Sequence, residues 1–111
     1  MHFCLTGHYT SKALSNILDN PTTNRQEAAK KAIETAGGKL ISFYGTPADG
    51  PGVLVIFDVP DPGAAAAISG VVVAAEVLQN VKLTRLLTQD EILKVRKHAV
   101  QVRKAYKPPG K

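Results

Sequence analysis

The chain has 111 residues, of which 44% are hydrophobic and 21% charged, with a formal net charge of +5 at pH 7. This length predicts one domain that buries roughly two thirds of the surface exposed by its unfolded form. A single cysteine excludes an internal disulfide, no apolar stretch reaches the roughly 20 residues of a membrane helix, and no secretory signal pattern opens the chain, so we expect a cytoplasmic protein.

Residues 2–10 alternate between two kinds of side chain, which predicts a strand with one face more apolar than the other. The apolar side carries Phe3, Leu5, Gly7 and Tyr9, and the other side carries His2, Cys4, Thr6 and His8. Residues 11–18 predict a short helix, and Asn20-Pro21 interrupts the chain after it. Asn24 and Glu27 have the spacing of a capping box and begin a longer helix, which Gly37-Gly38 ends.

Residues 40–46 and 53–59 predict an antiparallel hairpin, because the Pro- and Gly-rich residues 47–52 cannot continue either strand. Asp61 followed by Pro62 caps a further helix that runs to residue 75, although its three consecutive valines, 71–73, also favour strand. Gly70 lies inside this helix at a cost of about 1 kcal/mol relative to alanine, and we expect close backbone packing there.

Residues 80–87 alternate again and predict a fourth strand. Thr88, with Glu91 three residues later, caps a last helix that reaches residue 106. Its apolar residues repeat every three or four positions and form a narrow seam: Ile92, Val95, Ala99, Val102 and Tyr106. Such a seam must lie against something, either the protein's own sheet or a partner chain.

The order of these elements predicts an α+β fold of the ferredoxin-like βαββαβ type, with a four-stranded antiparallel sheet plus a C-terminal helix. Right-handed crossovers place both main helices on one face of the sheet and leave the other face bare. A second copy that covers this face gives a two-fold symmetric homodimer, or a higher homo-oligomer. Alternatively, the C-terminal helix covers this face of the sheet.

Several segments occur in an order shared with a known family. They are Tyr9-Thr10-Ser11-Lys12-Ala13-Leu14, Asn20-Pro21 with Arg25, Ile33-Glu34-Thr35-Ala36-Gly37-Gly38-Lys39-Leu40, Ser42-Phe43-Tyr44, Val55-Ile56-Phe57-Asp58-Val59-Pro60-Asp61 and Asn80-Val81. Over about residues 1–93 the chain resembles the GYD domain proteins. This resemblance implies a dimeric ferredoxin-like fold, of the dimeric α/β barrel type, without an established activity.

The Gly-Tyr-Asp tripeptide that names this family is missing from the expected place, which holds Asp49-Gly50-Pro51-Gly52. No role for the family's tyrosine or aspartate is therefore carried over to this chain. We expect a hairpin turn here, with Asp49 as a solvated loop carboxylate. A phosphate loop is disfavoured, because these glycines lead into a strand and not into a helix.

Residues 94–111 lie outside the resemblance and form a basic helix extension and tail. They hold seven of the fourteen basic residues and no acidic residue. This charge can neutralise phosphates, so nucleic-acid binding is one hypothesis for the segment. Tyr106 is its only aromatic residue for base stacking, which favours the simpler interpretation of a solvated helix face.

No residue pattern points to a cofactor or a metal. His2 and His8 lie roughly 20 Å apart along one strand and cannot share an ion. Cys4, in an apolar strand, is expected to be a buried, inert thiol.

We therefore expect a GYD-type homo-oligomer that binds a small molecule between sheet and helices, or binds another protein. The candidate ligand-binding residues are Thr6, His8, Ser42 and Tyr44. The alternative is an enzyme of the dimeric α/β barrel kind, similar to a monooxygenase or an isomerase, in which His8 and Tyr44 exchange protons with the substrate.

Overall fold

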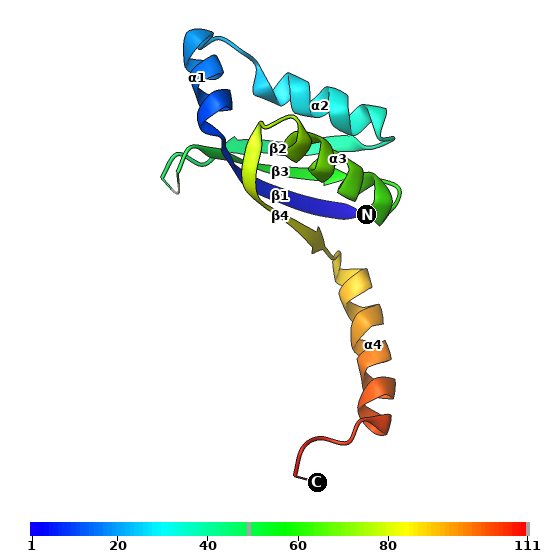
Figure 1. The fold of residues 1–111 in the computed structure, drawn as a ribbon. Coiled ribbons are helices and arrows are strands. Elements are labelled where there is room, and N and C mark those ends of the chain that lie inside the picture. The colour runs from blue at the N-terminus through cyan, green and yellow to red at the C-terminus, as the bar shows by residue number, and fades with distance from the viewer. Residues whose placement is uncertain (49, 111) are drawn as a thin grey trace.

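A computed structural model describes residues 1–48 and 50–110 as a single antiparallel sheet with four helices (Figure 1). Asp49, expected to be a solvated loop carboxylate, and Lys111 lie outside the described residues. The elements are β1 (His2–Tyr9), α1 (Ser11–Asp19), α2 (Arg25–Thr35), β2 (Lys39–Gly45), β3 (Gly52–Asp58), α3 (Pro62–Ala74), β4 (Leu78–Leu86) and α4 (Gln89–Ala105).

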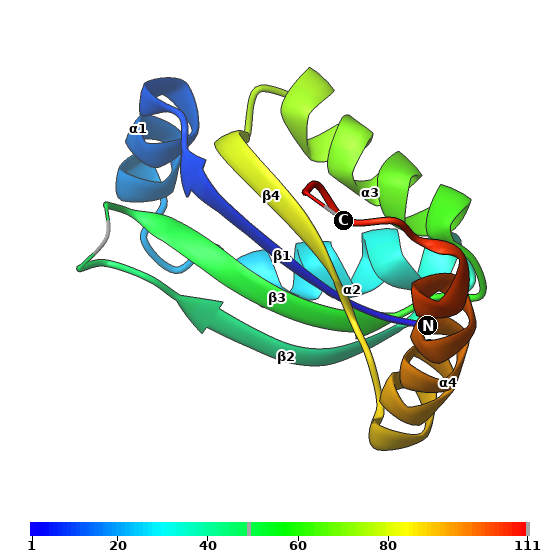
Figure 2. The ribbon, with the colours of Figure 1, turned by 90° about the horizontal axis from the view of Figure 1, so that it is seen from below.

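The strands lie in the order β2-β3-β1-β4, and α2 and α3 cover one face of the sheet. Figure 2 shows the face of the sheet that α2 and α3 do not cover. The predicted α+β fold of ferredoxin-like type is therefore confirmed.

Each helix begins where the sequence places a polar cap. A side-chain oxygen accepts a hydrogen bond from the backbone N–H three residues later at Thr10, Asn24, Asp61 and Thr88. The three valines that also favour strand are helical, because the Asp61 cap starts α3 and Ile68 anchors it in the core. Gly37, with φ +84°, follows α2 in the left-handed conformation that glycine adopts without steric cost.

The core lies between the sheet and the two helices that cover it. The central strands β1 and β3 supply most of it, and α2 and α3 add a few residues: Phe3, Leu5, Val53, Val55, Phe57, Ile33, Ala65 and Ile68. The rings of Phe3 and Phe57 stack with their centroids 6.1 Å apart. Every second residue of β1 and β3 therefore faces the core, as the alternation of the sequence predicts.

Close backbone packing occurs at a different glycine from the one expected. A Cβ atom added to Gly70 would meet nothing within 4 Å, so the prediction for this position is wrong. A Cβ atom on Gly52 would lie 2.2 Å from the carbonyl oxygen of Gly7. Glycine is thus required in β3 where it approaches β1, whereas in α3 it faces open space.

α4 leaves the rest of the molecule on the side of the sheet opposite α2 and α3 (Figure 1). The structure describes all 17 residues of α4, and none of them is buried. The radius of gyration is 17.8 Å, whereas a compact chain of about 100 residues has about 13 Å. α4 therefore does not act as the cover of its own sheet.

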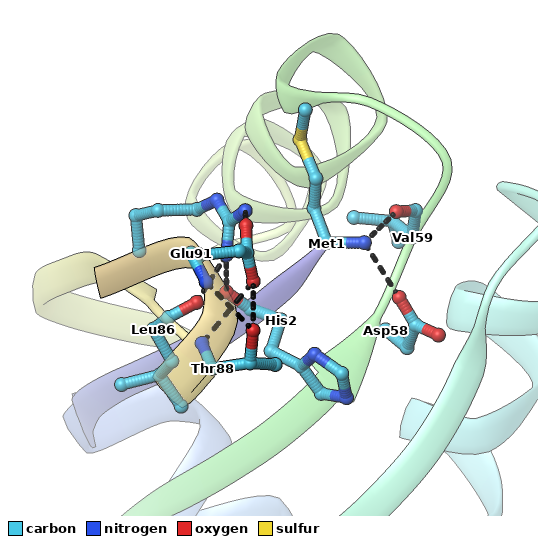
Figure 3. A network of polar contacts seen from close by, with 8 residues as sticks. Met1, His2, Asp58, Val59, Leu86, Thr88 and Glu91 are labelled. Atoms are coloured by element: carbon cyan, nitrogen blue, oxygen red, sulfur yellow. Dashed lines mark hydrogen bonds and ion pairs between the residues drawn. The ribbon is translucent and has the colours of Figure 1, made fainter. Parts of the chain in front are cut away.

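A polar network joins the first turn of α4 and the end of β4 to the start of β1 (Figure 3). The guanidinium of Arg85 donates to the carbonyl oxygens of His2 and Leu86 and pairs with the carboxylate of Glu91. The backbone N–H of Thr88 donates to Glu91 over 3.2 Å. That hydrogen bond, followed by those from Arg85 and the Thr88 hydroxyl, lowers the pKa of Glu91.

A second polar contact in Figure 3 joins the start of β1 to the end of β3. The amino group of Met1 donates to Asp58 Oδ1 over 2.8 Å and to the carbonyl oxygen of Val59 over 2.9 Å. These contacts lower the pKa of the Asp58 carboxyl, and they fix the register of the two central strands at this end.

Candidate functional site

The residues predicted to bind a ligand lie on the open face, which we define as the side of the sheet opposite α2 and α3. By strand register this face carries His2, Cys4, Thr6, His8, Ser42, Tyr44, Leu54, Ile56, Lys82, Thr84 and Leu86. Leu54 pairs with both Thr6 and Tyr44 and lies between them. The structure thus places all four predicted residues on one surface, but not around one point.

His8 and Tyr44, the predicted catalytic pair, belong to strands that are not neighbours. β3 separates β1 from β2, so the two backbones are roughly 10 Å apart. The His8 ring lies beside the hairpin loop, where a Cβ atom added to Gly50 would lie 3.2 Å from its Cδ2. Tyr44 is 61% exposed. The structure therefore does not bring these two side chains together.

The open face is a mixed surface with several half-buried apolar side chains, among them Leu54, Ile56 and Leu86. Cys4 is also half-buried and not fully buried as expected. Burial nevertheless raises the pKa of its thiol, which keeps it protonated at neutral pH. A surface of this composition is suited to contact with another protein surface.

An apolar cavity of about 240 Å³ lies on the other side of the sheet, beneath α2 and α3. It arises because α2 packs on the edge strand β2 and α3 packs on the opposite edge strand β4. The central strands between them form the floor, with Leu5, Val55 and Phe57. Along α2 the wall is made of Ala28, Ala29 and Ala32, which are too short to fill the space.

The cavity opens to solvent between the two helices. Val71 of α3 lines it and is 61% exposed. Ala28 of α2 also lines it and is exposed. None of Thr6, His8, Ser42 and Tyr44 is among the residues that line the described part of this cavity. The space between sheet and helices is present as expected, but other residues surround it.

Tyr9 and Arg25 supply polar groups to this apolar cavity. Burial is the largest influence on the Tyr9 hydroxyl and raises its pKa, against the opposing charge and hydrogen bond of Arg25. Arg25 also lines a second cavity of about 230 Å³, together with Asn16, Asn20 and Thr23. The two cavities share Arg25 and Val77, so they adjoin at that point.

These two polar residues were not predicted as site residues. Tyr9 lies on the apolar side of β1, as the alternation predicts, and nothing in that alternation indicates a role for its hydroxyl. Arg25 carried a weak signal, because a cation in the first turn of a helix opposes the helix dipole. Both residues belong to segments by which the sequence resembles a known family.

The model of the GYD domain matches residues 3–95, which is most of the chain. The chain belongs to the GYD domain family. The match includes every residue of the apolar cavity and ends inside α4, so most of the basic helix of this GYD protein lies outside it. None of the curated proteins compared with the chain matches it.

The part of this GYD protein that the structure describes contains neither a cluster of metal ligands nor a membrane-spanning helix. Among residues 1–48 and 50–110, no three His, Cys, Asp or Glu side chains gather as metal ligands. Of the helices that the structure describes, none is long and apolar enough to cross a membrane. The adjoining cavities at Arg25 are the candidate site, because the polar groups of Tyr9 and Arg25 lie there beside an apolar space.

Proposed function

We propose that this GYD protein is a cytoplasmic homodimer that binds a small, mostly apolar molecule in the cavity between its sheet and α2 and α3. The observation that carries the proposal is the cavity itself, with about 240 Å³ of mainly apolar space. An apolar cavity of about 150 Å³ is enough to bind benzene. The space beneath α2 and α3 can thus hold a molecule of about ten non-hydrogen atoms.

The dimer is supported by two surfaces that one copy leaves in water. One is the open face, and the other is the seam of α4, where Val95 is 54%, Val102 60% and Tyr106 65% exposed. A two-fold partner that covers the first also comes within reach of the second, because α4 projects from that side of the sheet (Figure 2).

The cavity is tested by filling it. Ala32→Phe places a ring in the space, whereas Ala66→Phe adds the same ring on an exposed part of α3 that does not line the cavity. Isothermal titration calorimetry with octan-1-ol is expected to show binding to the natural protein and to Ala66→Phe, and none to Ala32→Phe. Ala32→Leu serves if the larger ring prevents folding.

Two results would contradict the proposal. One is that folded natural protein, checked by circular dichroism, binds neither octan-1-ol nor octanoate. The other is that Ala32→Phe, folded as judged by its circular dichroism, binds octan-1-ol as the natural protein does.

Two other hypotheses stay predictions. An enzyme that uses His8 and Tyr44 has less support, since β3 separates them and neither lines the cavity. Nucleic-acid binding by α4 is supported only by the exposure of its basic side chains, and the same helix carries an apolar seam that fits a protein partner better.

A further inference from the structure

The charge of Arg25 is not balanced within the described chain. It occupies the first position of α2, where the helix dipole disfavours a cation. Within residues 1–48 and 50–110, no carboxylate lies within 4.0 Å of its guanidinium. The Tyr9 hydroxyl lies within hydrogen-bond reach of this guanidinium. A half-buried cation therefore stands between an apolar cavity and a more polar one.

We infer that the ligand of this GYD protein is an apolar carboxylic acid, whose apolar part fills the 240 Å³ cavity and whose carboxylate pairs with Arg25. This inference rests on the proposed function and adds the chemical class of the ligand. The guanidinium presents parallel N–H donors that match the two oxygens of a carboxylate. Tyr9 adds a hydroxyl donor at the same boundary.

A carboxylate fits this boundary better than the alternative head groups. An ammonium group would meet the positive charge of Arg25, and the two would repel each other in a half-buried setting. A neutral hydroxyl would accept one hydrogen bond but would leave the guanidinium charge uncompensated. A carboxylate accepts hydrogen bonds from the guanidinium and also balances its charge. Hydrogen bonds to charged groups contribute about 1.5–3 kcal/mol, which corresponds to tenfold or more in affinity.

The test compares three probes with the same eight-carbon chain: octanoate, octan-1-ol and octylammonium. Calorimetry on the full-length protein at pH 7 is expected to show octanoate binding at least about tenfold more tightly than octan-1-ol, and octylammonium more weakly than either. Arg25→Gln is expected to bind octanoate no better than octan-1-ol, because the neutral amide can donate to either head group but supplies no positive charge.

Lys31→Gln is the matched control, because it removes a positive charge from the same helix at an exposed position that lines neither cavity. It should keep the preference for octanoate. Arg25→Lys keeps the charge without the two-pronged geometry and should keep a reduced preference. This variant also tests the inference if Arg25→Gln does not fold.

Each outcome separates this inference from the proposed function. Similar affinities for octanoate and octan-1-ol in the natural protein would overturn the carboxylate inference and leave the cavity function standing. So would a preference for octanoate that persists in Arg25→Gln. Failure of all three probes to bind the folded protein would instead overturn the proposed function.

Discussion

The body of the molecule, residues 1–48 and 50–87, and the α4 arm, residues 89–105, begin with equally good local signals but end in opposite environments. α3 starts at the Asp61 cap and buries Ala65 and Ile68. α4 starts at a complete capping box formed by Thr88 and Glu91, yet it buries nothing. Capping therefore decides where a helix begins, whereas packing decides whether it has a fixed place.

The comparison shows which part of the structure the chain determines alone. In the body, Phe57 is 0% and Ile33 1% exposed, so the contacts that hold them are internal. In proteins most helical stability comes from the packing of an apolar face, and none of the 17 residues of α4 is buried. We therefore expect the proposed second copy to stabilise the arm by covering its apolar seam.

The largest expected difference between the two regions concerns large-to-small substitutions. Phe57→Ala is expected to lower the free energy of unfolding by about 3–5 kcal/mol, because it opens a void in the core. Val102→Ala in the arm is expected to change it by less than about 0.5 kcal/mol in dilute solution, where the seam is solvated. Urea denaturation followed by circular dichroism measures both. An equal loss from both substitutions would mean that α4 packs on the body.

The dependence of the arm on a partner is tested by placing a charge on its seam. Val102→Glu is expected to convert the dimer to a monomer, because a carboxylate cannot be buried unpaired in an apolar contact. Gln101→Glu adds the same charge one position away, off the seam, and should leave the dimer intact. Sedimentation equilibrium at micromolar concentrations distinguishes them. A natural protein that is monomeric under these conditions would contradict the proposed assembly.

Helix propensity should also act differently in the two regions. Gly70→Ala is expected to stabilise the body by about 0.5–1 kcal/mol, since the added methyl group meets open space. Ala99→Gly in the arm should reduce the helicity of α4 while the urea midpoint of the body stays unchanged. Hydrogen exchange resolves the two regions. A Gly70→Ala variant less stable than the natural protein would show that this glycine has a packing role.

The smallest expected effect is the pH dependence at the foot of α4. The pKa of Glu91 is lowered in the folded state from its ordinary value of 4.5, mainly by the Thr88 backbone N–H. The stabilisation that ionised Glu91 gives to the folded state is therefore complete at a pH above its ordinary pKa. This stabilisation is lost as the pH falls through the lower pKa of the folded state. Protection factors of the amide hydrogens in the first turn of α4, which correct for the intrinsic pH dependence of exchange, should fall in acid, and Glu91→Gln should remove this dependence. Unchanged protection factors across that range would contradict the assigned role of Glu91.

The body was largely predictable because its signals are local. Alternation in residues 2–10, the Asp61-Pro62 start and Gly37-Gly38 each fix one element without knowledge of the others. The cavity was not predictable in detail, since it depends on α2 and α3 packing on opposite edges of the sheet. For the same reason Tyr9 and Arg25, which are sixteen positions apart, gave no combined signal in the sequence.

For the α4 arm, the helix was predictable but its direction was not. The seam from residue 92 to residue 106 correctly indicated a helix that lacks a full apolar face. Its direction could not be deduced, because Glu91 in the first turn of α4 pairs with Arg85, which in turn donates to the carbonyl oxygen of His2, more than eighty residues earlier in the chain.

The alanine wall of α2 makes the size of the cavity adjustable. Ala28, Ala29 and Ala32 have no side-chain torsions, and the floor beneath them is fixed by the pairing of β1 with β3. Exchanging one methyl group for a longer aliphatic group would shorten the chamber without changing the strand register. In the proposed function, the small residues along α2 would therefore set the length of the ligand that this cavity accepts.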